Sequence, residues 1–135
     1  MGKLDDFINS LPKKVVETLQ GPVEGYVLNG VAYYKGIPYA AAPEGALRWR
    51  PPQPRATWRE PFKAFRAGFI CPQDAFQFPI IGQVGEDYLN LNIWSPEKID
   101  KPCPVMVWLH GGGFSAGSGS MPVYDGSHFA SLGIV

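Results

Sequence analysis

Hydrophobic and polar positions in the first part of the chain predict a short helix followed by antiparallel strands. In residues 3–11 four apolar side chains recur at roughly helical spacing, and Pro12 stops the helix. Short apolar runs then flank Asn29-Gly30, a dipeptide that favours a type I′ turn because both residues tolerate positive φ. We therefore expect a β-hairpin centred on this turn.

Residues 36–61 are predicted to form a long ordered loop around a folded body. Proline recurs six times in this stretch, which blocks a regular helix or an inner strand. Residues 71–85, rich in phenylalanine and glycine, are expected to form a second loop. The tryptophans are interpreted as packing residues: Trp49, Trp58, Trp94 and Trp108.

Two later segments are predicted to be strands. Residues 88–94 alternate polar and apolar positions, as a half-covered strand does. Residues 104–109 are apolar on both faces, which is typical of a strand buried in a mostly parallel sheet. Such a strand needs helices on both sides, and only 127–132 offers a candidate. The covering elements are therefore expected in sequence not present in this chain.

Composition narrows the class of protein. The chain has 135 residues, with 12 basic and 12 acidic side chains and a formal net charge of zero. No basic patch points to nucleic acid or to a membrane surface, and no apolar stretch approaches membrane-spanning length. We expect a cytoplasmic location, since the start resembles no signal peptide. Cys71 and Cys103 form no metal-type cluster, so neither a metal nor another cofactor is expected.

A glycine run directly after the second predicted strand carries the chemistry. Residues 110–114 read His-Gly-Gly-Gly-Phe. Glycines at the carboxyl end of a strand let the backbone turn sharply and point N–H groups into one space, where they can hold the oxyanion of an acyl-transfer intermediate. A plain glycine turn is the alternative interpretation of this run alone.

Further motifs accompany the glycine run. They are GIPYA at 36–40, PEGALRW at 43–49, the 54–58 segment, CPQ at 71–73 and EDYLNLN at 86–92. In this order and approximate spacing they resemble the type-B carboxylesterase family, and the resemblance spans about residues 15–135. It implies an α/β fold, the α/β-hydrolase fold. Residues 1–135 would be the N-terminal segment of a single catalytic domain, with its β-meander and first core strands only.

The resemblance assigns roles to the glycine run. Gly112 and Gly113 would donate two N–H groups to the oxyanion, and a third donor would follow a nucleophilic serine that lies outside this chain. His110 is expected to shape the turn by hydrogen bonding rather than to act as a base. The substrate pocket is predicted to include Gly111, Phe114 and Ser115, with Phe76 and Phe78 as weaker candidates for its rim.

The resemblance also implies a structural ion pair. The arginine of the Leu-Arg-aromatic motif, Arg48, would pair with Glu86 in a buried guanidinium–carboxylate fork that fixes two loops. Many secreted relatives bridge the cysteine at position 71 to one at the position where Tyr88 stands. That bridge cannot form here, which agrees with a reducing compartment. The segment 72–87 also lacks the tryptophan on which cholinesterases bind choline.

Residues 113–117 match the nucleophile pattern Gly-x-Ser-x-Gly around Ser115, and Asp125 and His128 follow. We reject this local triad. The nucleophile needs a strand leading into it and a helix leaving it, and Ser115 lies inside the glycine loop instead. Asp125 and His128 are expected to cap or flank the short helix near residue 126.

The sequence therefore predicts a serine esterase that hydrolyses small-molecule carboxylic esters. This chain would supply the oxyanion hole and part of the pocket, and would be inactive alone. Its partner would be the remaining C-terminal part of the hydrolase, possibly as a separate chain. The alternatives are a non-catalytic cholinesterase-like binding protein, an inactive fragment, or a small stand-alone domain.

Overall fold

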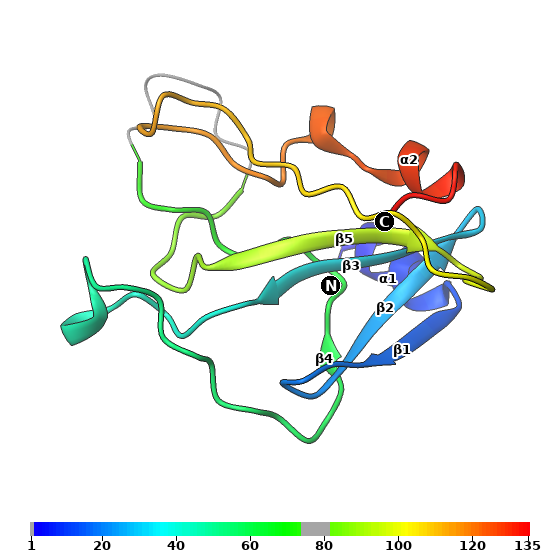
Figure 1. Ribbon diagram of the computed structural model, residues 1–135, viewed down its shortest axis with the longest axis horizontal. Coiled ribbons are helices and arrows are strands. Elements are labelled where there is room, and N and C mark those ends of the chain that lie inside the picture. Colours follow the sequence, from blue (N-terminus) through cyan, green and yellow to red (C-terminus); the bar gives the residue numbers. More distant parts are fainter. Residues whose placement is uncertain (1, 74–81) are drawn as a thin grey trace.

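The computed structural model describes residues 2–73 and 82–135. Within them the centre of the molecule is a five-stranded sheet with the order β1-β2-β3-β5, and β4 pairs with β2 (Figure 1). The elements are α1 (Lys3–Ser10), β1 (Lys13–Glu17), β2 (Pro22–Leu28), β3 (Val31–Pro38), η1 (Gly45–Leu47), β4 (Phe62–Lys63), β5 (Asn90–Pro96), η2 (Pro122–Tyr124) and α2 (Ser127–Ser131). The helix, the meander of strands and the late short helix expected from the sequence are confirmed.

The hairpin between β2 and β3 forms at the predicted dipeptide. Leu28 pairs with Val31, and the two residues between them have φ values of 52° at Asn29 and 75° at Gly30. Two successive positive φ values define a type I′ turn, whose twist matches that of the strands it joins. Local turn chemistry therefore sets the register of the first half of the sheet.

A third segment inserts between β2 and β3 where they diverge. The two strands pair directly only next to the hairpin, and β3 has an irregularity between Tyr34 and Ile37. Beyond that point the Ala64 N–H donates to the Glu24 carbonyl and the Lys35 N–H donates to the Ala64 carbonyl, each at 2.8 Å. The divergence of β3 is thus filled by residues 62–65, which keep the ladder continuous.

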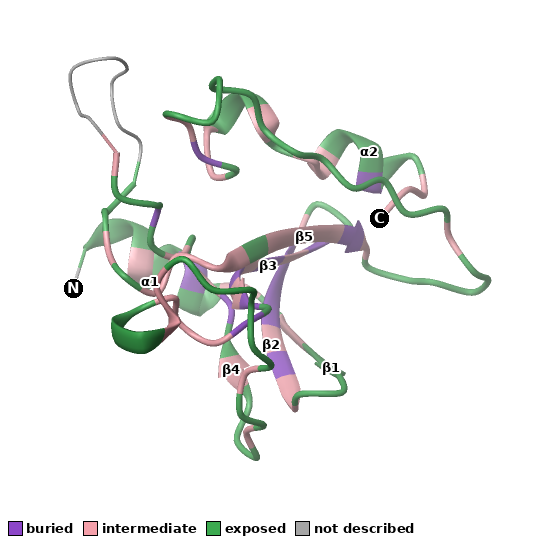
Figure 2. Cartoon of the chain, turned by 60° about the vertical axis from the view of Figure 1, so that its left-hand side comes forward, coloured by how far each residue is buried: buried purple, intermediate pink, exposed green. Residues whose placement is uncertain are grey.

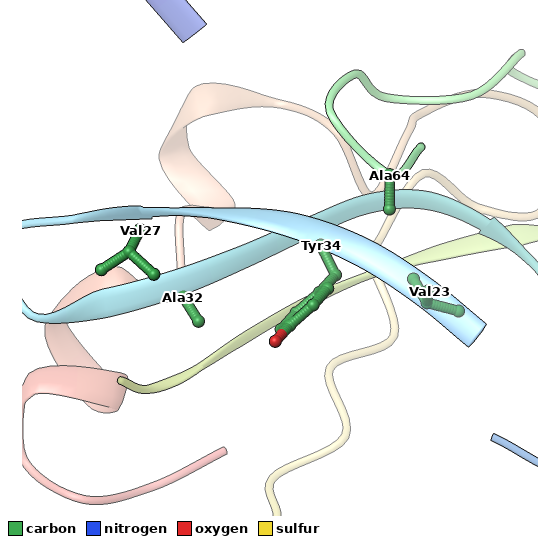
Figure 3. Close-up of a cluster of buried hydrophobic side chains, with 5 residues drawn as sticks. All are labelled: Val23, Val27, Ala32, Tyr34 and Ala64. Atoms are coloured by element: carbon green, nitrogen blue, oxygen red, sulfur yellow. The ribbon is translucent and has the colours of Figure 1, made fainter. Parts of the chain in front are cut away.

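The core is small and lies on the β2–β3 pair. Its buried side chains are Val23, Val27, Ala32, Tyr34 and Ala64 (Figure 3). Trp58 packs against this cluster, and its indole N–H donates to the Pro22 carbonyl at 2.7 Å. Burial raises the pKa of the Tyr34 hydroxyl above its ordinary value. The ring of Trp58 thus packs on the core while its indole N–H has a hydrogen-bond acceptor, as the packing role predicted for it requires.

An ion pair joins helix α1 to Arg66, the residue directly after the inserted segment. The Arg66 guanidinium donates from Nε to the Asp5 carboxylate at 2.9 Å and contacts the same oxygen through Nη2. Arg66 holds the pKa of Asp5 below its ordinary value of 3.8. Because the folded pKa is lowered, this contribution is present above pH 3.8 and is lost as the pH falls through the lowered value.

The prediction of a buried strand at 104–109 is wrong for this structure. Residues 105–109 are 45–85% exposed, and the segment forms no strand (Figure 2). Within residues 2–73 and 82–135 its backbone hydrogen bonds to another segment are the Met106 N–H to the Val135 carbonyl at 2.8 Å and the Val135 N–H to the Pro104 carbonyl at 2.9 Å. These two bonds have the pattern of a single parallel bridge. The apolar run lacks a strand partner along its length and a covering helix within the described residues, so it stays extended and exposed.

The packing role predicted for two of the tryptophans is also wrong. Trp49 is 95% exposed and has φ 60°, and Trp108 is 62% exposed, with the Tyr124 ring tilted against it at a centroid distance of 5.6 Å. No described segment covers either ring. In contrast, Trp94 on β5 is partly buried against Gly126. None of the described helices is long and apolar enough to span a bilayer.

Candidate functional site

The glycine loop, residues 110–119, closes on itself through one carbonyl group. The N–H groups of Ser115 and Ala116 both donate to the Gly112 carbonyl, at 3.1 and 3.2 Å, and the Ser115 hydroxyl also donates to it, at 3.1 Å. Gly112 has φ 135°, and a Cβ there would lie 1.6 Å from the Ala116 carbonyl oxygen. Only glycine fits at residue 112, because both its backbone conformation and this contact exclude a side chain.

The hydrogen bonds of this loop leave the N–H groups of its first five residues, 110–114, without a partner in the described part of the chain. The N–H groups of residues 115, 116 and 117 are all donated, to Gly112 and to Gln73. Those of Gly112 and Gly113 find no acceptor in the described part of the chain, and both residues are exposed. Gly113 has φ 60°, and the space where its Cβ would stand is open. A pair of free neighbouring N–H donors can bind an anionic oxygen.

His110 takes part in shaping the loop. Its ring Nδ1 lies 2.7 Å from the Gly111 carbonyl oxygen. A carbonyl oxygen only accepts, so Nδ1 must carry the proton and act as donor. His110 Nδ1 is therefore engaged with the backbone of the turn, in line with the shaping role expected for this residue.

The residues predicted to line the pocket lie around the same loop. A Cβ at Gly111 would have no neighbour within 4 Å, and Phe114 is fully exposed with a φ of 60°. The left-handed conformation costs a non-glycine residue about 1–2 kcal/mol. Ser115 points its hydroxyl back to Gly112. Phe76 and Phe78 lie outside the described residues.

Two side chains from other segments anchor the far end of the loop, and the sequence motifs had assigned neither of them a role. Gln73 binds Gly117 through both its amide atoms. Asn92, on β5, donates to the Gly119 carbonyl at 3.4 Å and to the Ser120 hydroxyl at 3.2 Å, while its oxygen accepts from the Gly36 N–H at 3.0 Å. Gln73 belongs to the CPQ motif and Asn92 to the EDYLNLN motif, and this membership was the sequence signal that could have identified them.

The rejected Ser-Asp-His combination does not assemble. Asp125 accepts a hydrogen bond from the Ser127 N–H at 2.9 Å, next to the first turn of α2, and His128 lies within that helix against Phe129. Burial alone would raise the pKa of Asp125, but the Ser127 hydrogen bonds and the charge of Lys35 outweigh it and lower the pKa. Within residues 2–73 and 82–135 no hydrogen bond joins Ser115 to either of the other two.

Two ion pairs join the proline-rich loop to the Glu86-Asp87 dipeptide. Arg48 Nη2 lies 2.9 Å from a Glu86 carboxylate oxygen, and Arg55 Nη1 lies 2.9 and 2.8 Å from the two oxygens of Asp87. The expectation that the first pair is a buried fork is wrong. Its side chains are 38% and 50% exposed and make one contact, because this part of the loop lies on the surface.

Exposure predicts a small energetic effect for both pairs. We expect the Arg48→Ala and Arg55→Ala variants each to lose less than about 1 kcal/mol of unfolding free energy, since water screens partly exposed ion pairs. Urea unfolding of the full protein measures this, with Arg50→Ala as a control at an exposed arginine. A loss above about 3 kcal/mol would instead indicate a buried charge left unpaired.

Among the described residues no group of three or more histidine, cysteine, aspartate or glutamate side chains is arranged to hold a metal ion. A small hollow in the described residues is lined by Asn92, Trp94 and Gly119, and neither Gly112 nor Gly113 lines it. The site is therefore an exposed glycine loop with unpartnered N–H groups, supported by a sheet. An antiparallel meander followed by such a glycine loop is the arrangement found at the start of α/β-hydrolases.

Comparison with known proteins defines the family. The sequence profile of the carboxylesterase family matches residues 12–135. The chain is 41% identical over 126 residues to the para-nitrobenzyl esterase of Bacillus subtilis (strain 168), covering 90% of this chain and 26% of that protein. It is 45% identical over 127 residues to the fumonisin B1 esterase of Sphingopyxis macrogoltabida, covering 92% of this chain and 23% of that protein.

Solved structures agree. A thermophilic para-nitrobenzyl esterase superposes with a TM-score of 0.81 at 40% identity, covering 87% of this chain and 25% of that one. A Geobacillus stearothermophilus carboxylesterase gives 0.78 at 44% identity, covering 87% and 24%. The chain belongs to the carboxylesterase family and has the N-terminal part of the α/β-hydrolase fold. It spans about a quarter of the length of the curated relatives that it matches.

Proposed function

We propose that this chain is the oxyanion-hole segment of a serine esterase that hydrolyses carboxylic esters. The observation that carries the proposal is the run of exposed N–H groups at residues 110–114, including those of Gly112 and Gly113, which find no acceptor in the described part of the chain. The names of relatives as para-nitrobenzyl esterase and fumonisin B1 esterase support an ester as the substrate class.

The chemistry follows from charge. A serine hydroxyl attacks the ester carbonyl, and the carbonyl oxygen becomes an oxyanion in the tetrahedral intermediate. Fixed N–H donors stabilise that charge more than they stabilise the neutral carbonyl, so they lower the barrier. Each donor is worth roughly 10²–10³ in turnover. The serine, the histidine that serves as base and acid, and the carboxylate that orients it are proposed to lie outside residues 1–135.

The exposed apolar run at 104–109 indicates that a further polypeptide segment covers this surface. Five consecutive large apolar side chains are exposed in this run, from Val105 to Leu109. Contiguous apolar patches on soluble proteins mark surfaces that another element covers. We assign this surface to the rest of the hydrolase domain, whose strands and helices would continue the parallel pairing begun at Val135.

A cytoplasmic location remains part of the proposal. Cys71 and Cys103 are both free, and the Cys71 thiol is exposed. An exposed free thiol suits a reducing compartment better than an oxidising one.

Fluorophosphonate labelling of the natively purified protein, followed by intact mass of every polypeptide present, tests the function. We expect one label per active site, on a serine outside residues 1–135. Label at Ser115 would contradict the division of roles between this chain and the rest of the enzyme. Folded protein without any label would favour the non-catalytic alternative.

A further inference from the structure

Gln73 forms a two-sided contact with the glycine loop. Its side-chain Nε2 donates to the Gly117 carbonyl at 2.9 Å, and its Oε1 accepts from the Gly117 N–H at 2.8 Å. Nε2 also donates to the Cys71 carbonyl at 3.1 Å, and the side chain is partly buried. A primary amide matches both backbone polar groups of one residue at once, so this contact fixes the orientation of Gly117 as well as its position.

Gly117 in turn lies directly against the start of the loop. With φ 117°, it leaves room for no side chain, since a Cβ would lie 2.7 Å from the Gly111 carbonyl oxygen and 2.8 Å from His110 Nδ1. His110 Nδ1 is itself bonded to the Gly111 carbonyl. Residues 110 and 111, which directly precede the Gly112 and Gly113 N–H groups, therefore pack against Gly117, the residue that Gln73 binds.

We infer that Gln73 is a positioning residue of the oxyanion hole, acting through Gly117 and His110 on the N–H groups of Gly112 and Gly113. The inference rests on the proposed function. Gln73 touches no reacting atom in this arrangement. It sets the place of the donors, and donor placement matters because a shift of about 1 Å in catalytic geometry can cost about 10² in rate.

The test uses the active enzyme with every polypeptide that accompanies this chain, and a para-nitrophenyl ester as substrate. We expect Gln73→Leu, which removes both hydrogen bonds to Gly117, to lower kcat about 10- to 100-fold with KM changed less than about 3-fold. Loss confined to kcat identifies an effect on the transition state rather than on substrate binding.

Gln73→Glu supplies a readout that a merely structural role would not give. A neutral carboxyl group can accept from the Gly117 N–H and donate to its carbonyl, whereas an ionised one can only accept. The ratio of variant to wild-type kcat is therefore expected to be near one at low pH and to fall about 10-fold as the introduced carboxyl ionises. His110 is the titratable group across Gly117.

Gln20→Glu is the matched control, because Gln20 is exposed and its side chain bonds to no described residue. Its ratio is expected to stay flat with pH. A flat ratio for Gln73→Glu, or a kcat within about 2-fold of wild type for Gln73→Leu, would overturn the inference while leaving the esterase intact. Absence of ester hydrolysis and of phosphonate labelling in the wild type would instead overturn the proposed function itself.

Discussion

Replacing Gly112 with alanine is expected to lower kcat at least 100-fold. The added Cβ would lie 1.6 Å from the Ala116 carbonyl oxygen, at a φ of 135° that alanine rarely adopts. The backbone must rotate to relieve that contact, and the Gly112 carbonyl would release the N–H groups of Ser115 and Ala116. Both proposed donors would then be displaced, and loss of one such donor alone costs roughly 10²–10³.

Gly119→Ala is the control for this prediction. Gly119 belongs to the same loop, has no positive φ, and has open space where its Cβ would stand. Steady-state kinetics of both variants with an ester substrate should therefore show a large loss at residue 112 and a change of less than about 3-fold at residue 119. If kcat changed equally in the two variants, the activity would not depend on the geometry of the Gly112 and Gly113 donors.

Gly36→Ala is expected to lower the stability of the protein substantially. Gly36 is buried at the irregularity of β3, with φ 70°, and a Cβ there would lie 2.5 Å from the Arg66 carbonyl oxygen and 2.7 Å from the Gly68 nitrogen. A left-handed alanine costs about 1–2 kcal/mol, and forced overpacking typically adds about 1–3 kcal/mol. We expect a loss of roughly 2–5 kcal/mol in the free energy of unfolding.

Gly30→Ala separates the two contributions. Gly30 has nearly the same φ, 75°, but a Cβ there would have no neighbour within 4 Å. Its loss should therefore stop at the conformational cost of about 1–2 kcal/mol. Urea unfolding of the full protein, followed by tryptophan fluorescence, measures both variants. If the Gly36→Ala variant were no less stable than Gly30→Ala, the backbone at residues 66–68 would have moved away from the added Cβ without loss of stability.

Gly36 also connects the sheet to the glycine loop. The Gly36 N–H donates to Asn92, and the same side chain holds Gly119 and Ser120. The Asn92 side chain therefore links β3 at Gly36 to the far end of the glycine loop. The Asn92 side-chain amide therefore couples the geometry of the sheet at Gly36 to that of the glycine loop that carries the proposed donors.

Local chemistry explains which parts of the fold the sequence could predict. Asn29-Gly30 specifies its turn with two residues, and the alternation before Pro96 specifies a half-covered strand. The run at 104–109 reads as a buried strand because its composition reflects neighbours that residues 2–73 and 82–135 do not provide. Its pattern therefore describes a different environment from the exposed one observed.

Contacts between distant segments explain what the sequence could not predict. The Gln73–Gly117 contact joins residues 44 apart, and the Arg55–Asp87 pair joins residues 32 apart. Neither spacing has a helical or strand period that would bring the groups together. The resemblance to a family pointed to Arg48 and Glu86 but gave no measure of exposure, so the pair was expected to be buried when it lies half-exposed.

The most direct test of the central claim is the structure of the active enzyme after reaction with a fluorophosphonate, whose phosphonyl oxygen stands in for the oxyanion. The account predicts that this oxygen lies about 2.7–3.1 Å from the nitrogens of Gly112 and Gly113. A phosphonyl oxygen held by other donors, with both glycine N–H groups turned to solvent, would contradict it.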